Sequence, residues 1–244
     1  MAVPRLAQTL ERLALTLTVR DLMVPTERLT CSEREKDAPA VSAEHPDFNV
    51  IPIKKRARQI TGYYERDSGF TKPIMADDLI SDGTSILDLL RTFEKRSYCF
   101  VLTNDQIAGY VHFSDLNHPF VKLALYTIIE AMESSALAMS NLVLDDQNLS
   151  RLLGRRRFTK IKQRLESAQK KDANRSWSDF LNIEDTLRTA VKENKIHLNE
   201  QEIKAITRMR NKVSHQGTPL VKDLNGAIEL ARIAGRCVQL LDAA

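Results

Sequence analysis

The residues with the clearest chemical potential lie between Arg210 and His215, late in a helix predicted over residues 199–216. At 100° per residue, one arc of this helix is apolar and comprises Ile203, Ile206, Met209 and Val213. Arg210 falls inside that arc. Because an unpaired buried charge is very costly, its guanidinium needs a carboxylate, a cluster of carbonyls or a subunit interface.

The adjoining stripe of the same helix is polar, and it places Asn211 and His215 one turn apart. An imidazole exchanges protons near neutral pH, and a guanidinium presents paired donors to phosphate or carboxylate oxygens. The segment therefore combines a proton-transfer group with a fixed positive charge. A structural alternative stays open, because the helix dipole also favours a histidine near a helix carboxyl end.

An arginine, four residues and a histidine, with asparagine directly after the arginine, resemble the signature of HEPN (higher eukaryotes and prokaryotes nucleotide-binding) domains. The resemblance covers about half of the chain, residues 119–244. It implies an all-helical, dimeric domain of a family that includes many metal-independent ribonucleases.

The resemblance further implies a composite cleft in which two copies of the motif meet across a twofold axis. Arg210 would stabilise the phosphorane charge, His215 would transfer a proton, and Asn211 would orient a partner or substrate group. RNA cleavage would need no metal and would leave 2′,3′-cyclic phosphate and 5′-hydroxyl ends. The alternative is a non-catalytic homodimer that binds RNA or protein.

Periodic apolar residues predict the elements that must position this motif. They predict helices over residues 121–144, 149–169, 178–193, 199–216 and 224–241, with Gly217-Thr218-Pro219 as a helix stop. Such helices with short connections favour a bundle. The second helix is rich in cations, and residues predicted to contact RNA phosphates are Arg155, Arg156, Arg157, Lys160 and Arg208. Solubility and local ion pairing are the alternative for these cations.

The amino-terminal half begins with a helix predicted over residues 5–18, from Leu6, Leu10, Leu13 and Leu17 at steps of three and four, and then changes to short β-branched runs. Strands are predicted over residues 48–53, 60–67, 98–102 and 107–113, and a helix containing Ile86 and Phe93 precedes the second pair. A helix followed by a strand hairpin thus occurs twice, roughly 50 residues apart, which indicates an internal repeat.

Val19-Arg20-Asp21-Leu22-Met23 and the stretch from Gly109 to Leu116 resemble tandem CBS (cystathionine beta-synthase type) domains. In that family an Asp three residues after a Thr or Ser binds the ribose of an adenine nucleotide. Asp115 matches the acid, whereas His112 stands at the hydroxyl position. The resemblance implies an adenine nucleotide as a regulatory ligand at Asp115. The alternative is that Asp115 only caps the helix beginning near Leu116.

Charge and hydropathy bound the remaining possibilities. Residues 1–118 hold 15 Lys and Arg against 17 Asp and Glu, and residues 119–244 hold 21 against 15. The second half is therefore where RNA should dock. The apolar run 120–144 is interrupted by Lys122, Glu130 and Glu133, so we expect no membrane span, and the amino terminus lacks a secretory pattern.

These observations predict an α+β CBS-like pair over residues 1–118, followed by an all-α HEPN-like bundle over residues 119–244. We expect a cytoplasmic homodimer that cleaves RNA in a toxin or antiviral-defence setting under the control of the CBS-like module. The setting implies an antitoxin or a defence partner.

Overall fold

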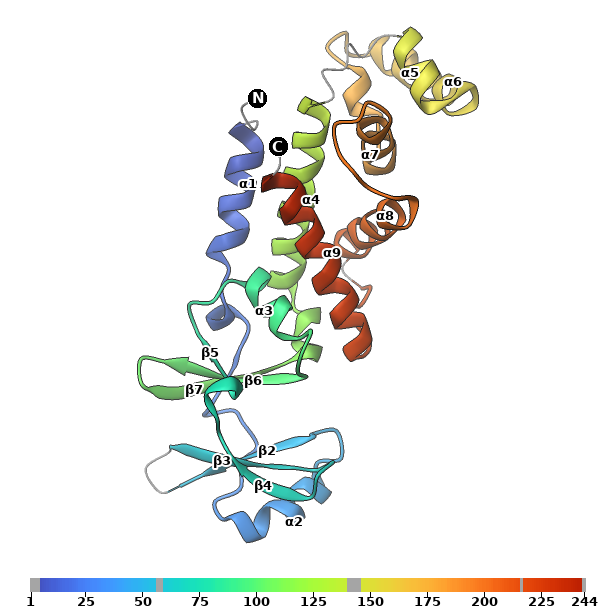
Figure 1. Cartoon of the computed structure of the whole chain (residues 1–244). Helices are drawn as coiled ribbons and strands as arrows, with labels where there is room; N and C mark the ends of the chain where they lie inside the picture. The colour runs from blue at the N-terminus through green and yellow to red at the C-terminus, as the bar shows by residue number, and fades with distance from the viewer. Residues whose placement is uncertain (1–4, 56–58, 140–145, 216, 243–244) are drawn as a thin grey trace.

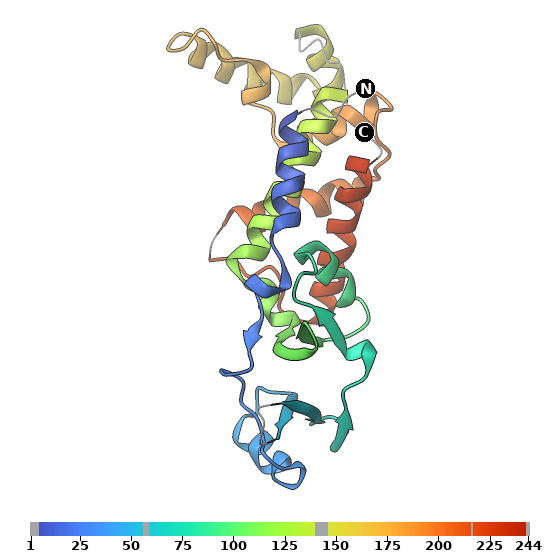
Figure 2. The same ribbon diagram turned by 90° about the vertical axis from the view of Figure 1, so that its left-hand side faces the viewer.

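The structure is a computed structural model, and it describes residues 5–55, 59–139, 146–215 and 217–242. Two small sheets follow one another along the long axis of the molecule. Helix α2 (Ala38–Glu44) lies beside the first sheet, and the long helices occupy the other end (Figure 1). A view turned by 90° shows the same elongated arrangement (Figure 2). The mixed architecture of the first half and the helical second half agree with the predicted fold class at this level.

The first sheet is an antiparallel meander in the order β2-β3-β4. Its strands are β2 (Val50–Lys54), β3 (Ile60–Glu65) and β4 (Phe70–Pro73), and α2 (Ala38–Glu44) precedes them. Gly62 permits close approach of the strands, because a Cβ there would lie 2.8 Å from the carbonyl oxygen of Lys72. The strands predicted around residues 48–53 and 60–67 are confirmed, whereas β4 was not predicted.

The second sheet has the order β1-β7-β6-β5. It contains β1 (Val24–Pro25), β5 (Leu79–Ser81), β6 (Tyr98–Thr103) and β7 (Gln106–His112). Helix α3 (Ile86–Thr92) precedes β6, and the Ser85 hydroxyl caps it by accepting from the backbone N–H of Asp88. A helix followed by a hairpin occurs twice, as α2-β2-β3 and α3-β6-β7. The two predicted hairpins are confirmed, whereas the helix of the first copy is α2, in a stretch that was predicted to be a loop, and not the helix predicted over residues 5–18.

The helical part begins at α4 (Pro119–Met139). It continues with α5 (Asp146–Leu153), α6 (Arg155–Gln169), α7 (Ile183–Lys192), α8 (Glu200–Ser214) and α9 (Leu224–Asp242). The prediction of one helix over residues 149–169 is wrong, because Gly154 adopts φ +80° and separates α5 from α6. Short 3₁₀ helices cover Val19–Asp21, Glu35–Asp37, Ala76–Asp78, Phe113–Asn117 (η4) and Trp177–Asp179.

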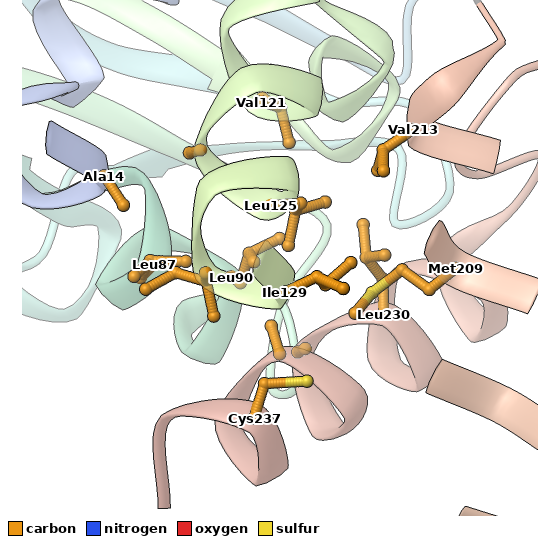
Figure 3. Close-up of a cluster of buried hydrophobic side chains, with 14 of the residues drawn as sticks. Ala14, Leu87, Leu90, Val121, Leu125, Ile129, Met209, Val213, Leu230 and Cys237 are labelled. Carbon is orange, nitrogen blue, oxygen red and sulfur yellow. The ribbon is translucent and has the colours of Figure 1, made fainter. Parts of the chain in front are cut away.

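The main hydrophobic core extends across the predicted boundary at residues 118–119. Helix α1 (Arg5–Thr16) packs along α4, and α3 packs against α9. Figure 3 shows the resulting cluster, in which Ala14 of α1 and Leu90 of α3 join Ile129 of α4 and Cys237 of α9. A smaller core lies between the sheets, around Tyr63 and Phe100. The second sheet and the helices thus share buried surface, although the secondary structure changes at the boundary.

No helix within the described residues combines the length and the apolar character that a membrane span requires.

Candidate functional site

Helix α8, which carries the arginine and histidine motif, has a well-defined start. The Asn199 side chain accepts from the backbone N–H of Glu202 at 2.9 Å, and the Glu202 carboxylate accepts from the backbone N–H of Asn199 at 2.8 Å. This capping box satisfies two backbone donors that the first turn leaves open. The predicted apolar arc is confirmed, since its members are all buried: Ile203, Ile206, Met209 and Val213.

Arg210 is half-buried and faces carboxylates on α4. Tyr126, Glu130 and Glu133 follow one another on successive turns of that helix. Burial, with the charge of Glu130, raises the pKa of both Tyr126 and Glu133, and the charge of Arg210 opposes this rise at both residues. A negative charge therefore lies within electrostatic range of Arg210 in the same chain, although no ion pair joins the Arg210 side chain to an acid among the described residues.

Glu133 is a titratable residue that the sequence argument did not assign to the site. Burial, assisted by the negative charge of Glu130, raises its pKa to about 7, against the opposing effect of Arg210. The Thr186 hydroxyl of α7 also donates to Oε1 of Glu133 at 3.4 Å. Two acids, Glu130 and Glu133, in a largely apolar helix were the sequence feature that could have indicated this residue. The sequence could not show that Arg210 lies near them, because Arg210 belongs to another helix.

Asn211 and His215 are exposed at the end of α8, where His215 is the first residue with an extended backbone. The ammonium group of Lys122, on α4, donates to the carbonyl oxygens of His215 at 2.9 Å and of Thr218 at 2.7 Å. These bonds fix the backbone that carries the imidazole. Within the described part of the chain, no hydrogen bond joins the side chains of Arg210, Asn211 and His215. The motif therefore presents an exposed imidazole at His215 and a half-buried guanidinium five residues earlier.

The basic helix α6 divides its cations into two groups. Arg157 is held by Asp185 of α7, with Nε 3.1 Å from Oδ1, and Lys162 pairs with Asp146. The other cations of α6 are exposed and have no ion pair among the described residues: Arg155, Arg156, Lys160 and Arg164. Arg208, on α8, lies 3.8 Å from Glu229. Of the predicted phosphate contacts, Arg157 thus has a structural partner, and Arg155, Arg156 and Lys160 face solvent.

A second site lies where the two repeats meet, in a cavity of about 400 Å³ around Asp115. Its walls come from the segment after β1, from residues 47–52 and from the end of β7 with η4. The lining includes Arg28, Leu29, Val50, Tyr110 and His112. The cavity combines apolar walls with a few polar groups, which is the usual composition of a small-molecule site.

Asp115 both caps η4 and lines this cavity. Its Oδ2 accepts from the backbone N–H of His112 at 2.8 Å, whereas Oδ1 receives no hydrogen bond among the described residues. Burial raises the pKa of Asp115 and lowers the pKa of His112. The capping role that was left open in the sequence is thus present, and one carboxylate oxygen remains for a ligand. Arg28 is exposed at the cavity without an ion pair in the described chain.

No group of three or more His, Cys, Asp or Glu side chains within the described residues is arranged to hold a metal ion.

Comparison with known proteins gives similarities to CBS domains. No family model matches the chain, and no curated protein matches it. The CBS domain of the bacterial CNNM/CorC family Mg²⁺ transporter, solved in complex with ATP, is 16% identical with a TM-score of 0.36 and covers 47% of this chain and 92% of its own. The same domain in another structure is 17% identical with a TM-score of 0.36, covering 50% of this chain and 86% of its own.

An uncharacterised conserved protein from Pyrococcus horikoshii is 16% identical with a TM-score of 0.32, covering 42% of this chain and 90% of its own. At these TM-scores the similarities do not establish a ligand or an activity. The comparisons found no HEPN domain. The two sites therefore rest on their own residues and geometry.

Proposed function

We propose that the protein is a homodimeric, metal-independent endoribonuclease whose active residues are Arg210, Asn211 and His215. The observation that carries the proposal is the arrangement at the end of α8. Arg210 stays half-buried beside the acids of α4, whereas His215 is exposed on a backbone that Lys122 holds in place. A fixed positive charge and an exposed imidazole on one helix would supply charge stabilisation and one proton transfer to phosphodiester transesterification.

In the proposed reaction the 2′-hydroxyl oxygen attacks the adjacent phosphorus and the bond to the 5′-oxygen breaks. His215 accepts the proton of the 2′-hydroxyl, and water gives a proton to the departing 5′-oxygen. Arg210 stabilises the charge on the phosphorane through paired N–H donors. The products carry a 2′,3′-cyclic phosphate and a 5′-hydroxyl.

The proposed dimer places a second copy against the outer face of α4. Phe120, Leu123 and Tyr126 recur at steps of three on this helix and are exposed by 40%, 42% and 36%. Tyr126 also lies in the electrostatic field of Arg210, so the apolar stripe adjoins the proposed active residues. A twofold contact there would bring two motifs together, as a composite cleft requires.

A second function, adenine-nucleotide binding, is favoured by the cavity at Asp115. The free carboxylate oxygen suits ribose hydroxyls, Leu29 and Val50 suit a base, and Arg28 suits a phosphate. We propose that the nucleotide regulates cleavage.

We also propose a cytoplasmic toxin or antiviral-defence setting with an antitoxin or a defence partner. A non-catalytic homodimer that binds RNA through the exposed cations of α6 remains the alternative.

Incubation of the purified protein with a labelled RNA pool in EDTA tests the ribonuclease. We expect fragments with cyclic phosphate and 5′-hydroxyl ends at a rate that the chelator does not change. RNA that is bound but stays intact would favour the non-catalytic alternative.

A further inference from the structure

The Asn117 side chain connects the two candidate sites. Its Nδ2 donates to the carbonyl oxygen of Val221 at 3.0 Å, and its Oδ1 accepts from the backbone N–H of Val221 at 3.1 Å. Nδ2 also donates to the carbonyl oxygen of Ser114 at 3.2 Å. One amide thus pairs with both backbone groups of a residue that is 104 positions away in the chain. Because Val221 is only 3% exposed, replacing these bonds with water would be difficult.

On one side of this connection lies the cavity. Asn117 is the last residue of η4, and Asp115 lies two residues earlier. The carboxylate of Asp115 reaches back to the backbone N–H of His112, so η4 is tied to the end of β7 by the same side chain that lines the cavity. A ligand that hydrogen-bonds to the Asp115 carboxylate therefore contacts η4, the short helix that carries Asn117.

On the other side lies the segment that follows His215. The Lys212 ammonium donates to the carbonyl oxygen of Leu220 at 3.2 Å, next to Val221 in the chain. Lys122, which follows η4 in the sequence, bonds the carbonyl oxygens of His215 and Thr218. Side chains from η4, α4 and α8 thus hold backbone groups on both sides of this segment, at His215, Thr218, Leu220 and Val221.

We propose that Asn117 is a positioning residue that transmits occupancy of the Asp115 cavity to His215. This inference rests on the proposed function, because it requires a nucleotide at Asp115 and an active residue at His215. In the occupied state η4 is held in place, the Asn117–Val221 pairing is strengthened, and the His215 segment stays in its active position. A ligand shifts such an equilibrium only by its difference in affinity for the two arrangements, and such couplings commonly change a binding or rate constant about 5-fold to 150-fold.

The test compares the wild-type chain, Asn117→Ala and the control Asn225→Ala, which removes an exposed asparagine of α9 near the same connection. ATP is the probe, and three quantities are measured with and without it: Tm, the rate of RNA cleavage, and the hydrogen exchange of the Val221 amide. For wild type and control we expect ATP to raise Tm, to accelerate cleavage about 5-fold or more, and to slow exchange at Val221.

Asn117→Ala should keep the ATP-dependent rise in Tm, because Asn117 does not line the cavity, and should lose the response of both cleavage and exchange. If this variant does not fold, Asn117→Asp serves instead, since it keeps the acceptor for Val221 and loses the donor.

A variant that responds to ATP as the wild type does would overturn the inference. A wild-type protein that cleaves RNA at a rate insensitive to ATP would also overturn it. The same holds for a wild-type protein that cleaves RNA and shows no change in Tm with ATP. In both cases the proposed ribonuclease activity stands. A wild-type protein whose Val221 exchange responds to ATP but which cleaves no RNA would overturn the ribonuclease and, with it, the transmission to an active His215. Loss of that response in Asn117→Ala would then show only that Asn117 couples the cavity to Val221.

Discussion

Glu133 of α4 lies near enough to Arg210 of α8 for the guanidinium to lower the pKa of the carboxyl, in opposition to burial. Burial has the larger effect, so the acid titrates near neutrality while it faces a permanent positive charge. Protonation of Glu133 therefore changes the charge that surrounds Arg210 within the physiological pH range.

The first prediction concerns stability and Glu133→Gln. The folded-state pKa is raised from 4.5 to about 7, so proton binding stabilises the folded chain fully below pH 4.5 and this contribution is lost as the pH rises through 7. The free energy of unfolding of the wild type should fall over this window by about 1–3 kcal/mol, because solvent screening at the partly exposed carboxyl reduces the full effect. The glutamine variant should lack this fall.

Urea denaturation at several pH values measures the difference. Glu166→Gln, on the exposed face of α6, removes the same charge without burial and should follow the wild type. Parallel profiles for wild type and Glu133→Gln would show that the carboxyl does not titrate in this range.

The second prediction concerns catalysis. His215→Ala and Arg210→Ala should each reduce RNA cleavage by about 10²-fold to 10⁴-fold, because one removes a proton-transfer group and the other a charge stabiliser. His215→Ala should keep its Tm, since this side chain is exposed. His197→Ala, another exposed histidine of the helical part, is the control and should cleave normally. A folded, dimeric His215→Ala protein with the wild-type rate would refute the assigned mechanism.

The third prediction separates two kinds of cation on α6. Arg156→Gln and Lys160→Gln together should weaken RNA binding and should reduce the slope of log affinity against log salt by about 1 per cation. Arg157→Gln should instead lower the free energy of unfolding by about 1–3 kcal/mol, because Asp185 would lose its partner. Filter binding over a salt series and urea denaturation distinguish the two effects. Equal salt slopes in wild type and double variant would place the RNA elsewhere.

The fourth prediction concerns the dimer. Leu123→Glu introduces a charge into the proposed contact on α4 and should produce monomers, with loss of cleavage, because the cleft needs both copies. Leu15→Glu makes the same change at a residue of α1 that is 50% exposed, and it should remain dimeric. Light scattering at micromolar concentration gives the masses. A Leu123→Glu protein that stays dimeric would exclude this face as the contact.

The fifth prediction concerns the cavity. ATP at a hundred times its dissociation constant should add about 2.7 kcal/mol to the free energy of unfolding. Asp115→Asn keeps an oxygen that can cap η4 but loses the carboxylate charge, so it should fold and bind ATP more weakly. Arg28→Gln should weaken ATP more than adenosine, which has no phosphate. Equal thermal shifts with ATP in wild type and Asp115→Asn would remove Asp115 from the site.

The structure also shows which features local sequence patterns can predict. The buried arc of α8 followed from its 3.6-residue periodicity, and β2, β3, β6 and β7 followed from β-branched runs. Each of these patterns involves residues that are close together in the sequence. The half-buried position of Arg210 also followed, since it depends on the face of one helix. Whether its guanidinium meets a carboxylate, carbonyls or a subunit interface stays a prediction.

The proximity of Glu133 to Arg210 could not be predicted, because the side chains of α4 and α8 meet only through tertiary packing. The cavity at Asp115 is similar, since Arg28 and Asp115 belong to different repeats. The break at Gly154 was missed because a glycine within a helical pattern is often tolerated. Its positive φ becomes evident only from the backbone.

The packing of α1 on α4 has a consequence for how the chain folds as it is synthesised. Helix α1 precedes α4 by about a hundred residues, which corresponds to about 5–20 s of translation. A free helix of 12 residues is marginal in water, so α1 gains lasting structure only when α4 has emerged to cover Ala14. The core that includes Ala14 therefore closes only after α4 has been synthesised.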